Sequence, residues 1–135
     1  MASVLIDSNI LLDVATQDPS WCPWSTEKLR SAGNEARLVI NPIIVAEVSV
    51  HYASLAQFDD AVPQSLFARE PISDEAAFLA GKCFAAYRRR GGAKTSPLPD
   101  FFIGAHASVA GYRLLTRDVA RYRSYFPTLP LIAPE

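Results

Sequence analysis

The sequence predicts an α/β fold in which a central, mostly parallel sheet is flanked by helices, giving a three-layer sandwich. Short apolar runs rich in Val, Ile and Leu alternate along the 135 residues with longer amphipathic segments. Strands that are separated by helices pair in parallel through right-handed crossovers. The length and a hydrophobic share of 50% also fit one compact domain over residues 1–135.

The N-terminal part of the chain contains two predicted strand–helix units. Residues 3–6 form the first strand, and the helix over 9–15 takes Ser8 or Asn9 as its N-cap. A turn over 18–24 precedes a helix over 25–32, which Gly33 and Asn34 stop. The next elements are a strand over 37–40 and a helix over 43–53, which Asn41 caps and Pro42 begins.

The C-terminal part continues the same alternation. It predicts a helix near 57–66 interrupted at Pro63, a strand over 67–72, a helix over 75–90 capped by Ser73 or Asp74, a helix from Pro97 or Pro99 to Ala110, a strand over 112–116, a helix over 119–125 and a last strand over 129–132. The segments between strands are long enough for parallel crossovers.

Composition excludes several classes of protein. The N-terminus has no basic region followed by an apolar run, and no apolar stretch approaches the length of a membrane span. Cys22 and Cys83 lie far apart, with no spacing typical of a zinc site or a disulfide framework. We therefore expect a soluble, cytoplasmic protein without a membrane partner.

The net charge of −1 hides an uneven distribution along the chain. Nine of the thirteen basic residues lie between Lys82 and Arg123, together with only two acids. A locally basic region can attract phosphate backbones even when the whole protein is nearly neutral. A solvated, Arg-rich helix face is the structural alternative.

Four carboxylates stand near the ends of predicted strands or at the start of the helices that follow them. In an open α/β sheet, ligands bind outside the carboxyl ends of the strands, so these side chains are expected to share one cleft. Gathered carboxylates repel one another unless a cation neutralises them, and oxygen ligands favour Mg²⁺ or Mn²⁺. The four residues are Asp7, Glu47, Asp100 and Asp118.

Each of the three aspartates also has an ordinary structural use. Asp7 and Asp118 can cap helices, and Asp100 suits a helix N-terminus. Glu47 is harder to explain in this way, because it is the one Asp, Glu, Lys or Arg between Arg37 and Asp59 and lies on an otherwise apolar helix. Buried carboxylates are rarely left unpaired, which favours a site role for Glu47.

The four acids and their surroundings resemble the acidic motifs of the PIN domain. Asp7 lies in VLIDSNILLDV, Glu47 in NPIIVAEV, Asp100 in PLPDFFIGAHA and Asp118 in LLTRDVARY, in the family's order across almost the whole chain. The C-terminal FPTLPLIAP is similar to the last strand of the VapC-type ribonucleases, the toxins of bacterial toxin–antitoxin pairs.

The resemblance implies a function, a cofactor and partners. In similar proteins the matching acids surround one or two Mg²⁺ or Mn²⁺ ions, and Ser8 or Asn9 and Thr116 match small polar positions that orient the site. The implied activity is metal-dependent endoribonuclease cleavage, which leaves a 5′-phosphate and a 3′-hydroxyl. The implied partners are an RNA substrate, a VapB-type antitoxin and a second copy of the chain in a homodimer.

The basic region then becomes a candidate RNA-binding surface beside the acids. Phosphate contacts supply affinity without sequence specificity. Tyr87, Tyr122 and Tyr125 are candidates for stacking on unpaired bases, with plain packing as the alternative. The candidate basic residues are Arg88, Arg89, Arg90, Lys94, Arg117 and Arg121.

Two other functions remain open at this point. An aspartyl-phosphate phosphatase or phosphotransferase would use Asp7 as the nucleophile, but the second aspartate expected two residues later is Asn9, and Lys94 is the one candidate for the required lysine. A non-catalytic, RNA-binding domain with a PIN-like fold is the second alternative. The presence of all four acids argues against it.

Overall fold

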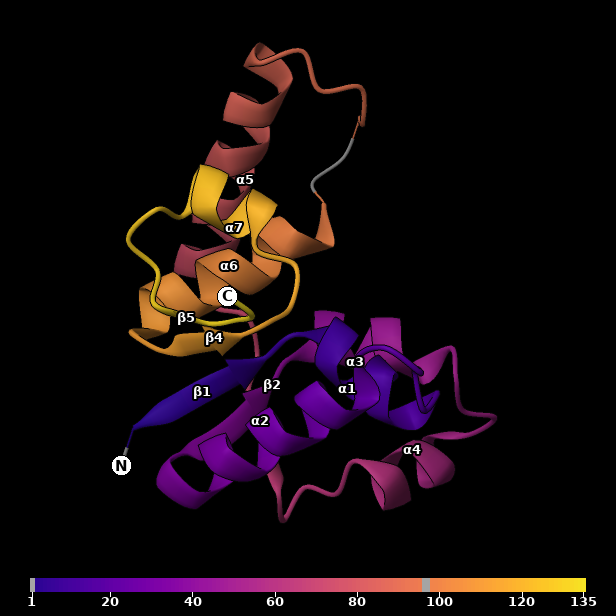
Figure 1. The fold of residues 1–135 in the computed structure, drawn as a ribbon. Coiled ribbons are helices and arrows are strands. Elements are labelled where there is room, and N and C mark those ends of the chain that lie inside the picture. The colour runs from indigo at the N-terminus through magenta and orange to yellow at the C-terminus, as the bar shows by residue number, and fades with distance from the viewer. Residues whose placement is uncertain (1, 96–97) are drawn as a thin grey trace.

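The computed structural model describes residues 2–95 and 98–135, and within them the strands form one parallel sheet in the order β3-β2-β1-β4-β5 (Figure 1). All four neighbouring pairs run parallel, so the predicted parallel architecture is confirmed. The strands are β1 (Ser3–Ile6), β2 (Arg37–Ile40), β3 (Phe67–Arg69), β4 (Arg113–Leu115) and β5 (Leu131–Ile132).

The helices form two groups with the strands between them, as Figure 1 shows. One group contains α1 (Ser8–Ala15), α2 (Cys22–Glu35), α3 (Pro42–Ser49) and α4 (Leu55–Ala61). The other contains α5 (Asp74–Arg89), α6 (Pro99–Ala110) and α7 (Ala120–Tyr125). This is the predicted three-layer sandwich.

The strand order places a topological switch point at the central strand β1. From β1 the chain moves outward to β2 and β3, then returns to form β4 and β5 on the other side of β1. Ile6 pairs with Leu115, so the residues that follow these two strands, Asp7 and Thr116, come out side by side. This is the position at which open α/β sheets bind their ligands.

The core consists of the central strands and the helix faces that cover them. Val4, Leu5, Ile6, Leu114 and Leu115 are fully buried. Continuous apolar runs of this kind are typical of parallel strands that are covered on both faces. None of the helices in the described ranges has the length and apolar character needed to cross a bilayer.

Several predicted boundaries differ from the structure. α2 begins at Cys22 and continues through Gly33 and Asn34 to Glu35, so these two residues do not stop it. Gly33 lies close to Leu38, since a Cβ atom on it would be 3.5 Å from Leu38 Cδ1. α3 ends at Ser49, short of the predicted Ala53. Packing against the sheet therefore outweighs the local breaking tendency of glycine and asparagine in α2.

Other predicted signals hold. The Asn41 side chain caps α3 by accepting a hydrogen bond from Ile44 N at 3.0 Å, with Pro42 at the first helical position. Ser73 caps α5, and Gly111 ends α6 in the left-handed conformation at φ 75°. Pro97, one of two predicted starts of α6, lies outside the described residues, and the structure begins the helix at Pro99.

Candidate active site

Asp7 joins the central strand to the first helix and is almost completely buried, with 3% of its surface exposed. It is the N-cap of α1, and its Oδ1 accepts a 2.7 Å hydrogen bond from Ser8 N. The prediction that Ser8 or Asn9 caps this helix is therefore wrong. The reason is geometric: β1 ends at Ile6 and α1 begins at Ser8, so the residue between them, Asp7, takes the N-cap position.

The second oxygen of Asp7 is the meeting point of three donors. Oδ2 accepts hydrogen bonds from Thr116 Oγ1 at 2.8 Å, Tyr122 OH at 2.9 Å and Asn9 Nδ2 at 3.3 Å. Burial nevertheless raises the pKa of Asp7 from 3.8 to about 6, and the nearby negative charge of Asp100 adds to the rise. Hydrogen bonds alone do not compensate this carboxylate for the loss of water.

Glu47 lies on α3, and a hydrogen bond joins its side chain to Ser8, the residue after Asp7. Its Oε1 accepts a 2.8 Å hydrogen bond from Ser8 Oγ, so Ser8 contacts both Asp7 and Glu47. Burial raises the pKa of Glu47, and the charge of Asp100 raises it further. Glu47 is thus held toward the other acids by a short polar side chain.

Asp100 lies on α6, in the opposite group of helices, and Asp118 lies in the segment between β4 and α7. Asp100 is the second residue of α6, and its Oδ1 lies 3.4 Å from the Tyr122 hydroxyl that also donates to Asp7. Burial raises the pKa of Asp100, Arg121 opposes this rise, and Asp118 contributes to it. Asp118 is exposed and follows β4, with its backbone N–H donated to Thr116 Oγ1 at 3.1 Å.

Asp118 does not cap the helix that follows it. α7 begins at Ala120 after Val119, with no hydrogen bond from a capping side chain. Asp118 therefore does not have the helix-capping role that the sequence left open. Asp7 does cap its helix, and it contacts Ser8, Asn9, Thr116 and Tyr122 at the same time. We call Asp7, Glu47, Asp100 and Asp118 the acid cluster.

Tyr122 is the residue that sequence reasoning misplaced. It is 1% exposed and joins Asp7 to Asp100 from α7, so it is not available for stacking on a base. Burial and the charges of Asp7 and Asp100 raise the pKa of Tyr122 well above 10, which keeps its hydroxyl a donor. No spacing in the sequence links Tyr122 to Asp7 or Asp100, which lie 115 and 22 positions away.

The acid cluster offers oxygen donors with uncompensated charge. Among the described residues, no three Asp, Glu, His or Cys side chains form a ready-made metal site. The pKa is raised for Asp7, Glu47 and Asp100 alike, and within the part of the chain that the structure describes Arg121 is the one cation that opposes any of these rises. A carboxylate set of this kind fits a hard divalent cation, which binds few protein oxygens and keeps several waters.

The predicted basic residues differ in whether an acid inside the fold already pairs with them. Arg117 donates to buried Asp13 at 2.8 and 3.0 Å, and its guanidinium lies 5.3 Å from the Trp21 ring centroid. Its charge is therefore used inside the fold. Arg121 faces Asp100 and Asp118 across a hollow beside the cluster. The rest are exposed on or after α5, where Arg88 donates to the Lys94 carbonyl at 2.6 Å; they are Arg88, Arg89, Arg90 and Lys94.

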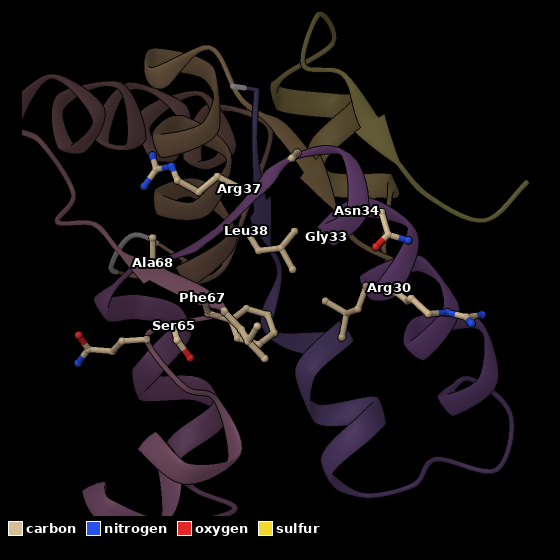
Figure 2. Close-up of a pocket in the computed structure, with 12 residues that line it drawn as sticks. Arg30, Gly33, Asn34, Arg37, Leu38, Ser65, Phe67 and Ala68 are labelled. Carbon is tan, nitrogen blue, oxygen red and sulfur yellow. The ribbon is translucent and has the colours of Figure 1, made fainter.

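A larger hollow of about 640 Å³ lies at the opposite ends of the strands (Figure 2). It is formed by the C-terminal half of α2 and the first residues of β2 and β3, and Leu38 and Phe67 project into it. None of the four acids lines it. The chemistry-bearing side chains therefore gather at the carboxyl ends of the strands, away from this hollow.

The acid cluster lies at the switch point of a parallel sheet, which is the position at which open α/β proteins bind their ligands. The sequence model of one such family, the PIN domain, matches residues 4–125. The chain belongs to the PIN domain family, as its acidic motifs indicated. No curated protein sequence matches the chain.

Solved structures share the fold along nearly the whole chain. VapBC2 from Rickettsia felis, bound to a DNA fragment from its promoter, matches with a TM-score of 0.74 and 17% identity over 98% of this chain and 99% of that chain. VapBC-1 from nontypeable Haemophilus influenzae gives 0.72 and 16%, over 97% of both chains. A toxin–antitoxin complex from Klebsiella pneumoniae gives 0.69 and 23%, over 98% of both.

Proposed function

We propose that this PIN domain is a metal-dependent endoribonuclease that hydrolyses RNA phosphodiester bonds. The observation that carries the proposal is Asp7, a buried carboxylate at the switch point whose pKa is about 6 although it accepts five hydrogen bonds from four residues. A site that retains such a charge without a cation of its own is suited to bind one from solution.

The chain's own residues would divide the work. Asp7, Glu47, Asp100 and Asp118 would hold Mg²⁺, or Mn²⁺ in its place. Ser8, Asn9 and Thr116 would orient the carboxylates through the hydrogen bonds that they already make. When bound, the ion polarises a phosphate oxygen and lowers the pKa of water. Tyr122 would keep Asp7 and Asp100 at a fixed separation.

RNA phosphates would be held by cations beside the acid cluster. Arg121 is the best placed, because it faces Asp100 and Asp118 across one hollow. Arg88, Arg89, Arg90 and Lys94 would extend this surface along α5 and the loop after it. Arg117 is the weakest member of the predicted set, because Asp13 already neutralises it.

We further propose that the protein is the toxin of a VapBC-type pair. Support comes from the structural neighbours, which are toxin–antitoxin complexes that share the fold end to end. The partners would be a VapB-type antitoxin and a second copy of the toxin.

The direct test incubates the purified protein with total RNA and Mg²⁺ or Mn²⁺ and maps the new ends. We expect fragments with 5′-phosphates and 3′-hydroxyls, which disappear with EDTA and in Asp7→Asn. The matched control is Asp60→Asn, an exposed acid on α4 that should cleave like the wild type. Cleavage that survives EDTA and Asp7→Asn would refute the mechanism, and hydrolysis of small phosphate esters would favour the phosphatase alternative.

The toxin assignment has its own test. Induced expression of the protein in bacteria should arrest growth. Co-expression of a small open reading frame next to the gene should restore growth, and the product of that reading frame should co-purify with the protein. Growth arrest that persists in Asp7→Asn would contradict a nuclease toxin, because the variant lacks the carboxylate at the centre of the site.

A further inference from the structure

His106 is a buried histidine that the proposed chemistry does not use. It is 5% exposed and lies on α6, the helix whose first turn carries Asp100. Its Nδ1 lies 2.9 Å from Nδ2 of Asn41, and its Nε2 lies 3.3 Å from Oε1 of Glu70. Asn41 is 1% exposed and lies between β2 and α3. The contact between the two side chains therefore joins α6 to the start of a helix in the other group (Figure 1).

The orientation of the Asn41 amide follows from the helix that it caps. The backbone N–H of Ile44 is a donor, so the Asn41 atom that lies 3.0 Å from it must be the amide oxygen. The Nδ2 group of Asn41 then faces His106, and it can act only as a donor. Nδ1 of His106 must therefore accept this hydrogen bond, and it carries no proton.

The second ring nitrogen of His106 leads to the same protonation state. Burial alone would raise the pKa of Glu70, but hydrogen bonds from Arg37 and Tyr112 lower it, so the side chain is a carboxylate and can only accept. Nε2 of His106 must therefore carry the proton that it donates to Glu70. Glu70→Gln would keep an oxygen that can accept this proton. Two independent neighbours thus select the neutral ring with its proton on Nε2.

We propose that His106 is a positioning residue of the acid cluster, acting through Asn41 on the separation between Glu47 and Asp100. The inference rests on the proposed function, in which these two acids hold the cation. Asp100 and His106 share α6, whereas Asn41 caps the helix that carries Glu47. The hydrogen bond between Asn41 and His106 therefore fixes one helix against the other, and with them the two carboxylates. A proton on Nδ1 would break this bond, because it would face the amide N–H of Asn41.

The first test determines the protonation state without a metal ion. Nitrogen NMR spectra of the imidazole rings at slightly alkaline pH should show His106 with a bare Nδ1 and a protonated Nε2. Asn41→Asp should move the proton to Nδ1, because a carboxylate caps a helix as well as an amide does but cannot donate. His51, the second histidine of the chain, is exposed and should give the same signals in both proteins. A proton on Nδ1 of His106 in the wild type would overturn the inference.

Substitutions of His106 then separate the roles of its two nitrogens. Asparagine carries its amide oxygen as many bonds from Cα as Nδ1 of histidine, whereas the polar atoms of glutamine lie as far out as Nε2. His106→Asn should therefore keep an acceptor for Asn41 and bind Mg²⁺ like the wild type in calorimetry. His106→Gln should bind Mg²⁺ about tenfold more weakly, a typical loss for residues that orient metal ligands. The matched control is His51→Gln, which should leave the affinity unchanged.

A substitution of Asn41 separates the contact with His106 from the helix cap. Serine is as good an N-cap as asparagine, but its single hydroxyl cannot serve Ile44 and also reach His106. Asn41→Ser should therefore weaken Mg²⁺ binding as His106→Gln does, while the amide of Ile44 stays protected from hydrogen exchange. This variant also decides the question if His106→Gln does not fold.

Two outcomes of the Mg²⁺ titrations would overturn the inference: equal affinities in His106→Asn and His106→Gln, or wild-type affinity in Asn41→Ser. The outcomes also separate the two proposals. RNA cleavage by a protein whose variants all bind Mg²⁺ like the wild type would overturn the positioning role alone. Mg²⁺ affinities in the expected order without RNA cleavage would overturn the nuclease function alone.

Discussion

Asp7 and Glu70 both accept hydrogen bonds from a tyrosine, and they differ in whether the fold gives them a cation. Asp7 accepts from Tyr122 at 2.9 Å, and Glu70 accepts from Tyr112 at 2.9 and 2.8 Å. Arg37 also donates to Glu70 and forms an ion pair with it. Burial raises the pKa of Asp7 to about 6, whereas the pKa of Glu70 is lowered, because hydrogen bonds from Arg37 and Tyr112 outweigh its burial.

The difference separates a structural carboxylate from a reactive one. Glu70 follows β3 and ties it to Arg37 at the start of β2, to Tyr112 before β4 and to His106 on α6. Its charge is satisfied within the fold. Asp7 has donors but forms no ion pair with a cation of the described residues, so its charge is available to a ligand from solution. The following changes exploit this contrast, and we order them by the size of the expected effect.

Asp7→Asn should have the largest effect on activity. Removing the central carboxylate should lower the rate of Mg²⁺-dependent RNA cleavage by roughly three orders of magnitude, because cation stabilisation of the transition state is worth several kcal/mol. Glu70→Gln should cleave at the wild-type rate below its melting temperature. Single-turnover assays measure both, and equal losses in the two variants would remove the distinction.

The pH dependence of stability should have opposite signs at the two sites in metal-free protein. The raised pKa of Asp7 means that the folded state holds its proton more tightly, so its contribution to stability is lost as pH rises from 3.8 through about 6. The full rise in pKa corresponds to roughly 3 kcal/mol. The lowered pKa of Glu70 means that its contribution is present above 4.5 and is lost as pH falls below that value.

Urea unfolding between pH 3 and 7 in EDTA measures both limbs of this pH dependence. Asp7→Asn should flatten the decline between pH 4 and 6, and Glu70→Gln should remove the loss on the acid side. If Asp7→Asn retains the full decline, the pKa of Asp7 is not its source.

Glu70→Gln should reduce stability at neutral pH by about 2 kcal/mol, the usual value of hydrogen bonds to a charged group. The loss follows because Arg37 keeps its charge without a carboxylate to receive it. Denaturant unfolding measures the change. Arg37→Gln combined with Glu70→Gln is the control, and the double variant should lose less than the sum of the single ones if the two residues act as a pair.

Mg²⁺ should stabilise the folded protein through the acid cluster. At a concentration ten times the dissociation constant the gain is about 1.4 kcal/mol, and the melting temperature should rise accordingly. The same titration should leave Asp7→Asn unchanged while Glu70→Gln responds like the wild type. An equal response of Asp7→Asn would place the bound ion elsewhere.

Local sequence signals predicted much of this structure. Asp7, Glu47, Asp100 and Asp118 were identified because strand ends and helix starts are readable from apolar periodicity, and parallel strands bring those ends together. Contacts made by side chains across the fold were not readable in this way. The Tyr122 contact with Asp7 spans 115 positions and that of Tyr112 with Glu70 spans 42, and no spacing rule links such residues.

The same limit applies to the basic residues. Arg117 and Arg121 are equally charged, and both were expected to hold RNA beside the acids. The structure separates them, because Arg117 pairs with buried Asp13 whereas Arg121 lines a hollow with Asp100 and Asp118. The N-cap of α1 shows a smaller error, because the sequence placed it at Ser8 or Asn9 and the structure places it one or two residues earlier, at Asp7.

The connection between Asp7 and Tyr122 has a consequence for the order in which the protein is made. Tyr122 is synthesised 115 positions after Asp7, so the hydrogen bond between them cannot form until the ribosome has made the whole intervening chain. Asp100 and Asp118 also follow Asp7 in the order of synthesis. A chain that has been made only as far as α5 therefore lacks two members of the acid cluster, and the proposed activity would have to wait for them.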